Sequence, residues 1–297
     1  FFFLEMNTRI QVEHPVTEMV TGIDIIEEQI RIASGFPIRY KQEQVKQSGH
    51  AIECRIYAEN PAKDFMPSPG NISLYHHPVG EGIRLDVSIN NKATIHSFFD
   101  PMISKLICWG GDRETARNIA IEAMEQYIIQ GIETNIPYLI ELLKSDNYIQ
   151  NSIYTTLCDD ITSQLVEGIN RKKHDFPKSI PIIAYLLYDL NKEKISEKTL
   201  NLWQKIGYWR NVMEVNLKLE NEIYLVDILK IDGKNFEFSY KKEILKTNIH
   251  AISEGVIQFT LNNIRYQSYI SSCYKGNSSV SVNGLTFKIN RLDTLCE

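Results

Sequence analysis

Several features that mark other protein classes are scarce or absent in this sequence of 297 residues. The longest apolar stretch, Ile180 to Leu190, is interrupted by Pro181 and Asp189 and is far shorter than the ~20 residues that a membrane span needs. No basic block or stripe stands out, and 32 basic against 37 acidic residues give a formal net charge of -5. These absences argue against a membrane span and against nucleic acid as the main partner.

The five cysteines are scattered, odd in number and without CxxC spacing, so the sequence predicts neither a disulfide framework nor a zinc site. We therefore expect a reducing compartment, the cytoplasm, or the mitochondrial matrix in a eukaryote. The chain also lacks an initiator Met. Its first residues, Phe1-Phe2-Phe3-Leu4, are typical of the middle of a buried strand, so we expect a fragment of a longer chain.

What is present is a succession of local patterns. Residues 1 to 14 have an extended pattern that Pro15 ends, and Gly49 to Ile56 is typical of a strand. Two helices are predicted by their caps, one starting at Thr21 and ending near Gly35, the other starting at Asp112 and ending near Gly131. The second helix has one apolar face, made of Ala116, Ile119, Ala120, Ala123 and Tyr127. Pro67-Ser68-Pro69-Gly70 predicts a rigid turn.

The character of the sequence changes near residue 165. A charged linker, Arg171 to His174, is expected to lead into a helical pattern from Ile182 to Ile206, and Met213 to Leu219 then alternates as a half-buried strand does. Turn signals separate the later strands at Asp232-Gly233, Asn262-Asn263 and Asn283-Gly284. This part predicts an antiparallel barrel or sandwich packed on a helix.

Near the start, polar residues recur at every second position, namely Glu5, Asn7, Arg9, Gln11 and Glu13. In an extended chain all five point to one face, and Leu4, Met6, Ile10 and Val12 point the other way, into a core. One interpretation is a solvated edge strand with alternating charges. The other is a binding site, because so many polar groups are costly to desolvate unless they are paired or bind ions.

The literal string decides between these interpretations. The sixteen residues FLEMNTRIQVEHPVTE resemble the signature of biotin carboxylases in the ATP-grasp superfamily. The likeness continues through GHAIECRIYAENP, FMPSPG, FFDPMISKLICWG and TNIPYL, in the family's order and spacing, and it covers residues 1 to 158. Phe98-Phe99 replaces a common tyrosine pair, which puts a hydrogen bond at Phe99 in doubt. Asn60 and Met66 replace a common Asp and Leu.

The resemblance implies a role for each polar position. Glu5 and Asn7 would hold Mg²⁺ (or Mn²⁺) on the ATP phosphates. Arg9 would clamp bicarbonate, with Gln11 and the backbone of Val12 completing that pocket. Catalysis would rest on Arg9, Arg55 and Glu13. Glu13 would be the general base that deprotonates bicarbonate, and Arg55 would stabilise the enolate-like biotin.

Other residues in the matching segments receive lesser roles. From the residues alone Arg55 could instead pair with Glu53 or Glu59 on a strand surface. His14 is expected to be a structural hydrogen-bonding residue, and Asp100 and Lys105 belong to the scaffold or a subunit contact. The resemblance implies two steps, in which bicarbonate and MgATP form carboxyphosphate and the CO₂ released from it carboxylates biotin. The glycine-rich ATP loop, its lysines and a further Mg²⁺ ligand should precede Phe1, so we expect the fragment alone to be inactive.

The resemblance implies an α+β fold in three parts: residues 1–48 as the C-terminal part of an ATP-grasp domain, 49–160 as a biotin carboxylase C-terminal domain of antiparallel sheet and helices, and 161–297 as a β-rich docking domain. The last part weakly resembles the linking domain of acyl-CoA carboxylases, a helix surrounded by an antiparallel barrel, with an unrelated β-rich appendage as the alternative. Gly207-Tyr208-Trp209-Arg210 would lie at its helix–strand junction.

The expected function is therefore ATP-dependent carboxylation of biotin, as the biotin carboxylase component of an acyl-CoA carboxylase of the methylcrotonyl-CoA or propionyl-CoA type. The expected partners are a biotin carboxyl carrier domain, a carboxyltransferase β subunit and further copies in a homo-oligomer. Biotin would sit on a separate module, since no Met-Lys-Met motif is present. Two alternatives are a non-catalytic docking scaffold for the β subunit and the biotin carboxylase part of another biotin-dependent carboxylase. A pyruvate carboxylase would continue into an α/β barrel, for which residues 165 to 297 show no βα alternation.

Overall fold

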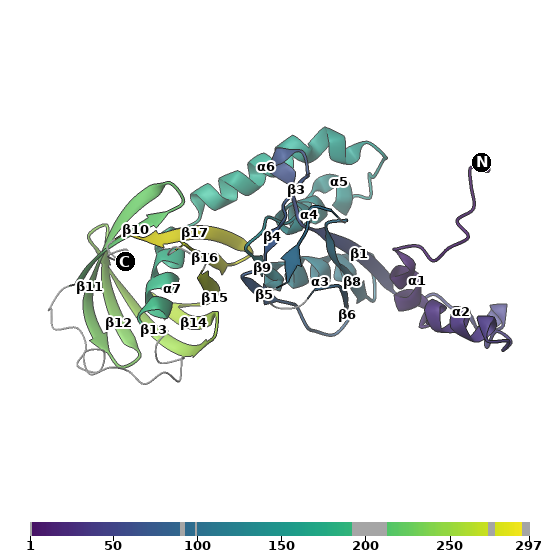
Figure 1. Ribbon diagram of the computed structural model, residues 1–297, viewed down its shortest axis with the longest axis horizontal. Helices are drawn as coiled ribbons and strands as arrows, with labels where there is room; N and C mark the ends of the chain where they lie inside the picture. The colour runs from purple at the N-terminus through teal and green to yellow at the C-terminus, as the bar shows by residue number, and fades with distance from the viewer. Residues whose placement is uncertain (1, 90–92, 99, 192–212, 273–276, 293–297) are drawn as a thin grey trace.

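The computed structural model describes residues 2–89, 93–98, 100–191, 213–272 and 277–292. Figure 1 shows an elongated molecule, with an N-terminal segment and two short helices at one end, a small sheet with helices in the middle, and a β-barrel at the other end. The order in space therefore follows the order in sequence.

The N-terminal segment is not a strand. Residues 2–7 have no regular structure, and Leu4 and Met6, which we expected to point into a core, are 92% and 74% exposed. A strand is stable only when its backbone N–H and C=O groups pair with a neighbour, and residues 2–10 pair with no strand among the described residues. The alternation was detected correctly, but the expected buried face is wrong.

Two helices follow, where the sequence predicted one. Helix α1, His14–Thr21, begins after Glu13, and Pro15 fits its first turn because that turn needs no N–H donor there. Gly22 ends it with a φ of 71°. Helix α2, Ile25–Ala33, is capped by Asp24, whose carboxylate accepts a 2.7 Å hydrogen bond from the backbone N–H of Glu27. Thr21, the predicted cap, instead ends α1. A 3₁₀ turn, η1, follows at Gln42–Gln44.

The central sheet has the strand order β1–β8–β6, and both pairings are antiparallel. Its strands are β1 (His50–Tyr57), β8 (Met102–Gly110) and β6 (Ile83–Val87). Helix α3, Arg113–Gln126, covers one face, and Asp112 caps it as predicted, accepting from the backbone N–H of Thr115 at 2.8 Å. The predicted apolar face of α3 is confirmed, because Ala116 and Ala120 are fully buried against this sheet.

Smaller elements surround the sheet. Three short antiparallel pairs join β2 (Glu59–Asn60) to β3 (Met66–Pro67), β4 (Gly70–Asn71) to β7 (Thr94–Ile95), and β5 (Leu74–His76) to β9 (Ile128–Gln130). A 3₁₀ turn η2 (Pro61–Lys63) and helices α4 (Ile136–Lys144) and α5 (Asp146–Ile149) complete this part.

Helix α6, Leu157–Asp175, runs from the central part toward the barrel (Figure 1). It includes Arg171 to His174, so the predicted charged linker is wrong. These charges belong to the last turn of a helix, where cations interact favourably with the helix dipole. Lys172 pairs with Glu141 at 2.6 Å and Lys173 with Glu220 at 2.7 Å, which ties α6 to both neighbouring parts.

Helix α7, Ser179–Asp189, forms the described part of the predicted helical stretch; residues 192–206, and Gly207 to Arg210 after them, lie outside the described residues. It is apolar on all sides, with Ile182, Ile183 and Leu186 fully buried. A helix of this kind needs a surrounding core, and the barrel supplies one with side chains such as Phe238 and Phe287.

The barrel is closed and antiparallel, with the strand order β10 to β17. Its strands are β10 (Met213–Leu219), β11 (Glu222–Asp232), β12 (Asn235–Tyr240), β13 (Glu243–Ser253), β14 (Val256–Leu261), β15 (Ile264–Ser272), β16 (Asn277–Val282) and β17 (Leu285–Arg291). All three predicted turns connect consecutive strands. Asn283 and Gly284 both have positive φ, 49° and 73°, as a two-residue hairpin of the primed type requires. The prediction of a barrel on a helix is thus confirmed, and closure leaves no free edge.

Buried hydrogen bonds join the barrel to the central part. Gln130 on β9 is 1% exposed, and its amide nitrogen donates to the backbone carbonyl of Tyr269 at 3.0 Å and to Oγ of Ser281 at 2.7 Å. The hydroxyls of Ser73 and Ser271 lie 2.9 Å apart. The bonds of Gln130 are enclosed and have little competition from water, so they fix the contact between the two parts, and the partly exposed Ser73–Ser271 bond adds to them. No helix in the described residues is long and apolar enough to span a membrane.

Candidate active site

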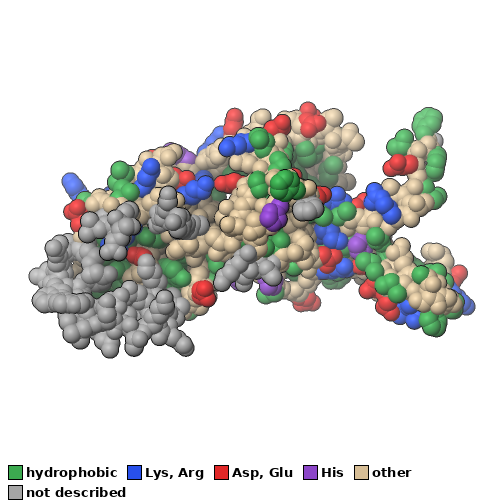
Figure 2. Space-filling view, in the orientation of Figure 1, with side chains coloured by type: hydrophobic (Ala, Val, Ile, Leu, Met, Phe, Trp, Pro, Cys, Tyr) green, Lys and Arg blue, Asp and Glu red, His purple; other side chains and the backbone are tan. Residues whose placement is uncertain are grey.

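The face of the sheet opposite α3 carries charged side chains. On β1, Cys54 and Ile56 point into the core with α3, so Glu53 and Arg55 point to the other face. The strand register places Arg55 beside Lys105 of β8, and Lys105 beside Asp86 of β6. A row of two cations and one carboxylate therefore crosses the sheet, and helix α1 packs over it. Figure 2 shows acidic and basic side chains interspersed where the middle of the molecule meets its N-terminal helices.

The central contact joins the predicted base to the predicted biotin-facing arginine. Oε2 of Glu13, the residue just before α1, lies 2.6 Å from Nη2 of Arg55. The side chains are 51% and 40% exposed, so both remain open to a ligand. Arg55 also approaches Glu53, with 3.6 Å between Nε and Oε1. The pairing with Glu53 that we considered from the residues alone therefore exists, and Glu13 forms the shorter contact.

Glu53 is the buried acid of the cluster. Its side chain is 5% exposed, and neither carboxylate oxygen has a hydrogen-bond partner among the described residues. Burial raises the pKa of Glu53, although the positive charges of Lys105 and Arg55 act in the opposite direction. The carboxyl group of Glu53 helps to hold the guanidinium of Arg55 on this face through the 3.6 Å contact.

Lys105 connects the sheet to the N-terminal segment. Its Nζ lies 3.2 Å from Oδ2 of Asp86 and donates to the backbone carbonyl of Val12, also at 3.2 Å. From the sequence we expected Lys105 to belong to the scaffold or to a subunit contact, and this contact with Val12 was not predicted. The available signal was a lysine within the apolar run Met102 to Trp109. Such a lysine must find a partner when its strand is buried, and here it fixes the residue next to Glu13.

Arg84 anchors α1 to the sheet. Its Nη1 lies 2.6 Å from Oε2 of Glu18, a residue of α1 that is 8% exposed, and its Nε lies 2.9 Å from Oδ1 of Asp86. The hydrogen bond with Asp86 is the main cause that raises the pKa of Arg84. Burial alone would raise the pKa of Asp86, but the hydrogen bonds from Arg84 and Lys105 outweigh it and the pKa is lowered. Because α1 is held at Glu18, Glu13 before its first turn stays near Arg55.

The other predicted residues are not brought into this cluster. Glu5, Asn7 and Arg9 lie on the exposed N-terminal segment and form no hydrogen bond or ion pair with other described residues. Gln11 is also exposed, and its backbone carbonyl accepts from Nδ1 of His14 at 2.7 Å. His14 thus has the structural role we expected, with Nε2 buried and unpartnered. In the described residues, the five polar side chains do not come together to form one binding site. Of these five, Glu13 alone contacts Arg55.

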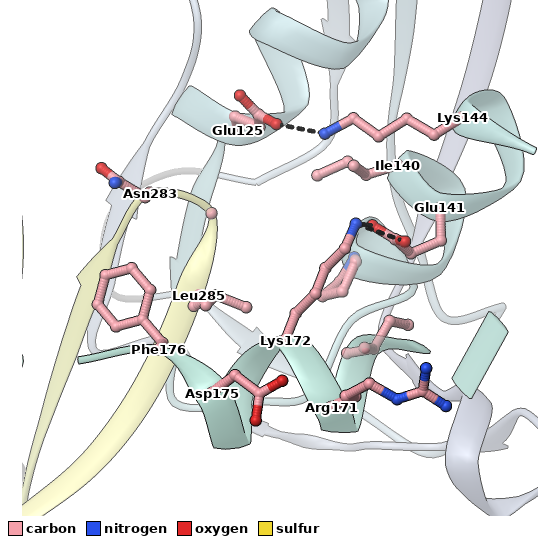
Figure 3. Close-up of a pocket in the computed structure, with 13 residues that line it drawn as sticks. Glu125, Ile140, Glu141, Lys144, Arg171, Lys172, Asp175, Phe176, Asn283 and Leu285 are labelled. Atoms are coloured by element: carbon pink, nitrogen blue, oxygen red, sulfur yellow. Dashed lines mark hydrogen bonds and ion pairs between the residues drawn. The ribbon is translucent and has the colours of Figure 1, made fainter. Parts of the chain in front are cut away.

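A cleft of about 450 Å³ lies elsewhere, between α4, α6 and the hairpin of β16 and β17. Figure 3 shows its two ion pairs, Glu125 with Lys144 and Glu141 with Lys172, over apolar side chains. None of the predicted site residues lines it. The size of a cavity does not by itself indicate catalysis, whereas groups with shifted pKa values are typical of active sites. The charged cluster around Arg55, with Glu53 and Asp86, is therefore the better candidate for an active site.

Two family models match this chain. The family "Biotin carboxylase C-terminal domain" covers residues 53–160, and "Carbamoyl-phosphate synthase L chain, ATP binding domain" covers residues 1–41. The chain is 49% identical over 155 residues to biotin carboxylase 1 of Bacillus subtilis, which is 52% of this chain and 34% of that protein. It is 32% identical over 307 residues to the mitochondrial propionyl-CoA carboxylase alpha chain of Homo sapiens, covering 99% of this chain and 41% of that one.

Among solved structures, the chain is similar to the biotin carboxylase domain of Hydrogenobacter thermophilus 2-oxoglutarate carboxylase, in complex with MgADP, ADP and bicarbonate. The TM-score is 0.54 with 44% identity, covering 55% of this chain and 36% of the other. The proteins that this chain resembles are carboxylases or parts of carboxylases. Within that class the similarity is to biotin carboxylases, and residues 53–160 match the biotin carboxylase C-terminal domain family. The chain spans 34% to 41% of the length of these two curated relatives.

Proposed function

We propose that this chain carries the part of a biotin carboxylase site that faces bicarbonate and biotin. The observation that supports this most strongly is the 2.6 Å contact between Glu13 and Arg55, two residues from separate family segments. A carboxylate and a guanidinium at one open site can respectively accept a proton and stabilise developing negative charge. In a buried structural ion pair, by contrast, both partners are shielded from ligands.

In this proposal Glu13 accepts the proton of bicarbonate, and Arg55 lies beside the atom on which negative charge develops when biotin loses its proton. Glu53 holds Arg55 from below through the 3.6 Å contact, and Lys105 fixes the carbonyl of Val12. Arg9, Gln11 and the backbone of Val12 would bind bicarbonate, since a guanidinium fork matches a planar oxyanion. Biotin, when bound, supplies the ureido nitrogen that takes up the carboxyl group.

Glu5 and Asn7 would hold Mg²⁺ or Mn²⁺ on the ATP phosphates. No group of three or more His, Cys, Asp or Glu in the described residues could hold a metal ion. Mg²⁺ commonly takes only one or two protein carboxylates together with phosphates and water, so the two oxygen donors fit such an ion chemically. Their exposure in the structure leaves both side chains accessible.

The acyl-CoA carboxylase type is the finer part of the proposal. The likeness to the propionyl-CoA carboxylase alpha chain extends over 99% of this chain and so includes the barrel. We infer that residues 161–297 dock a carboxyltransferase β subunit, with residues 1–48 and 49–160 as the two preceding domains. We further propose that the protein works with a carrier domain that bears biotin, forms a homo-oligomer and resides in the cytoplasm or the mitochondrial matrix. The match to a 2-oxoglutarate carboxylase supports the alternative that this chain is the biotin carboxylase part of another biotin-dependent carboxylase.

A chimera tests the carboxylase proposal. The aligned third of B. subtilis biotin carboxylase 1 is replaced by the matching residues of this chain, and bicarbonate- and biotin-dependent ATP hydrolysis is measured. We expect activity in the chimera and none in residues 1–297 alone. A folded but inactive chimera would refute the carboxylase proposal, and bicarbonate-dependent hydrolysis by residues 1–297 alone would refute the expected inactivity.

The docking proposal is tested separately, because a vestigial scaffold could still bind a partner. The chain is mixed with the β subunit of a propionyl-CoA carboxylase, and complex formation is followed by size-exclusion chromatography with light scattering. We expect a complex that persists in Glu13→Gln, since Glu13 directly precedes α1, which lies at the opposite end of the molecule from the barrel (Figure 1). A complex combined with an inactive chimera would favour the scaffold alternative over the enzyme.

A further inference from the structure

The outer edge of β1 is covered near Arg55 by a side chain rather than by a strand. In the sheet order β1–β8–β6, β1 is an edge strand, and its outward N–H and C=O groups need partners. The carboxamide of Asn135 provides two of them. Its oxygen accepts from the backbone N–H of Tyr57 at 2.9 Å, and its nitrogen donates to the backbone carbonyl of Arg55 at 3.0 Å.

The backbone of Asn135 adds a third bond. Its N–H donates to the carbonyl of Tyr57 at 3.2 Å. Asn135 thus imitates a short stretch of neighbouring strand, with one donor and one acceptor in the side chain and one donor in the main chain. The side chain is almost fully enclosed, since Asn135 is 6% exposed. An enclosed carboxamide with both ends satisfied holds its partners firmly, because water cannot replace either bond.

The position of Asn135 shows that this arrangement is not ordinary helix capping. Asn135 is the N-cap residue of α4, where asparagine normally accepts from the second or third backbone N–H of the helix. Here no such capping bond forms. The second helical residue is Pro137, which has no N–H to donate. The carboxamide binds the edge of β1 instead.

We propose that Asn135 is a positioning residue for Arg55. The guanidinium of Arg55 reaches Glu13 only if the backbone of residue 55 keeps its place in the sheet. On its inner side that place is set by pairing with Lys105 of β8, and on its outer side by Asn135. For its catalytic meaning the inference rests on the proposed function; the geometric part does not depend on it.

The residue type at position 135 is constrained by this role. Asn135→Asp keeps the acceptor for the Tyr57 N–H but loses the donor to the Arg55 carbonyl and places a charge in an enclosed site. Asn135→Ala loses both bonds. Ser68→Ala is the matched control. Oγ of Ser68 accepts at 3.0 Å from the backbone N–H of Glu133, two residues before Asn135, and the substitution keeps the backbone hydrogen bond from Ser68 to Ala58.

The test is NMR of the 297-residue chain. The Nε–Hε signal of Arg55 reports whether its guanidinium is paired with Glu13, and the Glu13→Gln variant gives the signal of the unpaired state. Hydrogen exchange of the Tyr57 amide reports whether its hydrogen bond at the edge of β1 is intact. In Asn135→Ala we expect the Arg55 signal to move toward that reference and the Tyr57 amide to exchange at least about tenfold faster. In Asn135→Asp only the Arg55 signal should move, and in Ser68→Ala neither should change.

An unchanged Arg55 signal in folded Asn135→Ala would overturn the proposal. If that variant does not fold, Asn135→Asp decides, and an unchanged Arg55 signal there overturns it equally. An equal change in Ser68→Ala would also overturn it, since any disturbance of the loop would then suffice. Because these measurements use no substrate, a failed carboxylation assay would leave their result standing and would refute only the proposed function.

Discussion

Glu13 and Arg55 are 42 residues apart in the sequence, yet Oε2 of the first lies 2.6 Å from Nη2 of the second. The contact depends on three separate attachments. Glu18 binds Arg84 and so holds α1 on the sheet, Lys105 binds the carbonyl just before Glu13, and the register of β1 and β8 sets Arg55. The charged residues that surround the pair therefore act mainly by fixing its geometry.

A first prediction concerns Glu53, whose pKa burial raises against the influence of Lys105 and Arg55. When the pKa of a carboxyl group is raised in the folded state, its ionisation lowers the free energy of unfolding. This loss of stability is absent at low pH and is complete above the raised pKa. Glu53→Gln should therefore gain stability relative to the unsubstituted chain as the pH rises from 3 to 7. Urea unfolding at several pH values measures this; a difference that is constant with pH would contradict it.

Asp86 should behave in the opposite way. Its pKa is lowered by Arg84 and Lys105 despite partial burial. Its contribution to stability is thus present above the ordinary pKa of an aspartate and is lost as the pH falls through the lowered value. Asp86→Asn should cost about 1 kcal/mol at pH 7, since the group is partly solvated, and almost nothing in acid. Equal destabilisation at both pH values would argue against the ion pairs.

The cysteines provide a chemical test of the core. Burial raises the pKa of both Cys54 and Cys108 to about 12, so neither forms the reactive thiolate at neutral pH. Cys158 is exposed. With iodoacetamide at pH 7.5, mass spectrometry should find Cys158 modified and the other two protected until the chain is unfolded. Rapid modification of Cys54 in the native chain would mean that the sheet does not pack on α3 as described.

Gln130 tests the join between the central part and the barrel. Its enclosed amide donates to the carbonyl of Tyr269 and to Oγ of Ser281, and Gln130→Ala removes both hydrogen bonds, although Ser281 keeps its contact with Thr286. We expect a loss of about 1–3 kcal/mol in the free energy of unfolding, the usual cost of an unsatisfied buried polar group. Limited proteolysis should also separate the barrel from the rest more readily. Unchanged stability and cleavage would show that the two parts are joined by other contacts.

The sequence predicted those features that depend on local pattern. The cap at Asp112, the apolar face of α3, the alternation of β10 and the hairpin turns at Asn262-Asn263 and Asn283-Gly284 are all confirmed. Each follows from a short-range rule. The boundary between α1 and α2 was missed because Asp24 competes with Thr21 as a cap, and the end of α6 was missed because helical charges resemble those of a linker.

The site was predicted less completely, for a physical reason. The period of two in residues 5–13 is a property of the sequence, but whether that segment becomes a strand depends on a partner strand far away in the chain. Likewise Lys105, Arg84 and Asn135 act through contacts 66 to 93 residues away, which no local pattern contains. The resemblance assigned both Glu13 and Arg55 to the catalytic site, and the structure places them in contact, although the role of each residue stays a prediction.

The most direct test of the account is the Glu13→Gln substitution in the B. subtilis chimera, with biotin-dependent carboxylation as the readout. Removing a general base while keeping its shape should lower the turnover at least about 100-fold, and circular dichroism should show an unchanged fold. Glu18→Gln serves as the control with a smaller loss, because it weakens the anchor of α1 to Arg84 and leaves an amide oxygen that can still accept from the backbone N–H of Ile25. A chimera that carboxylates biotin equally well with Glu13 or with Gln at this position would contradict the account.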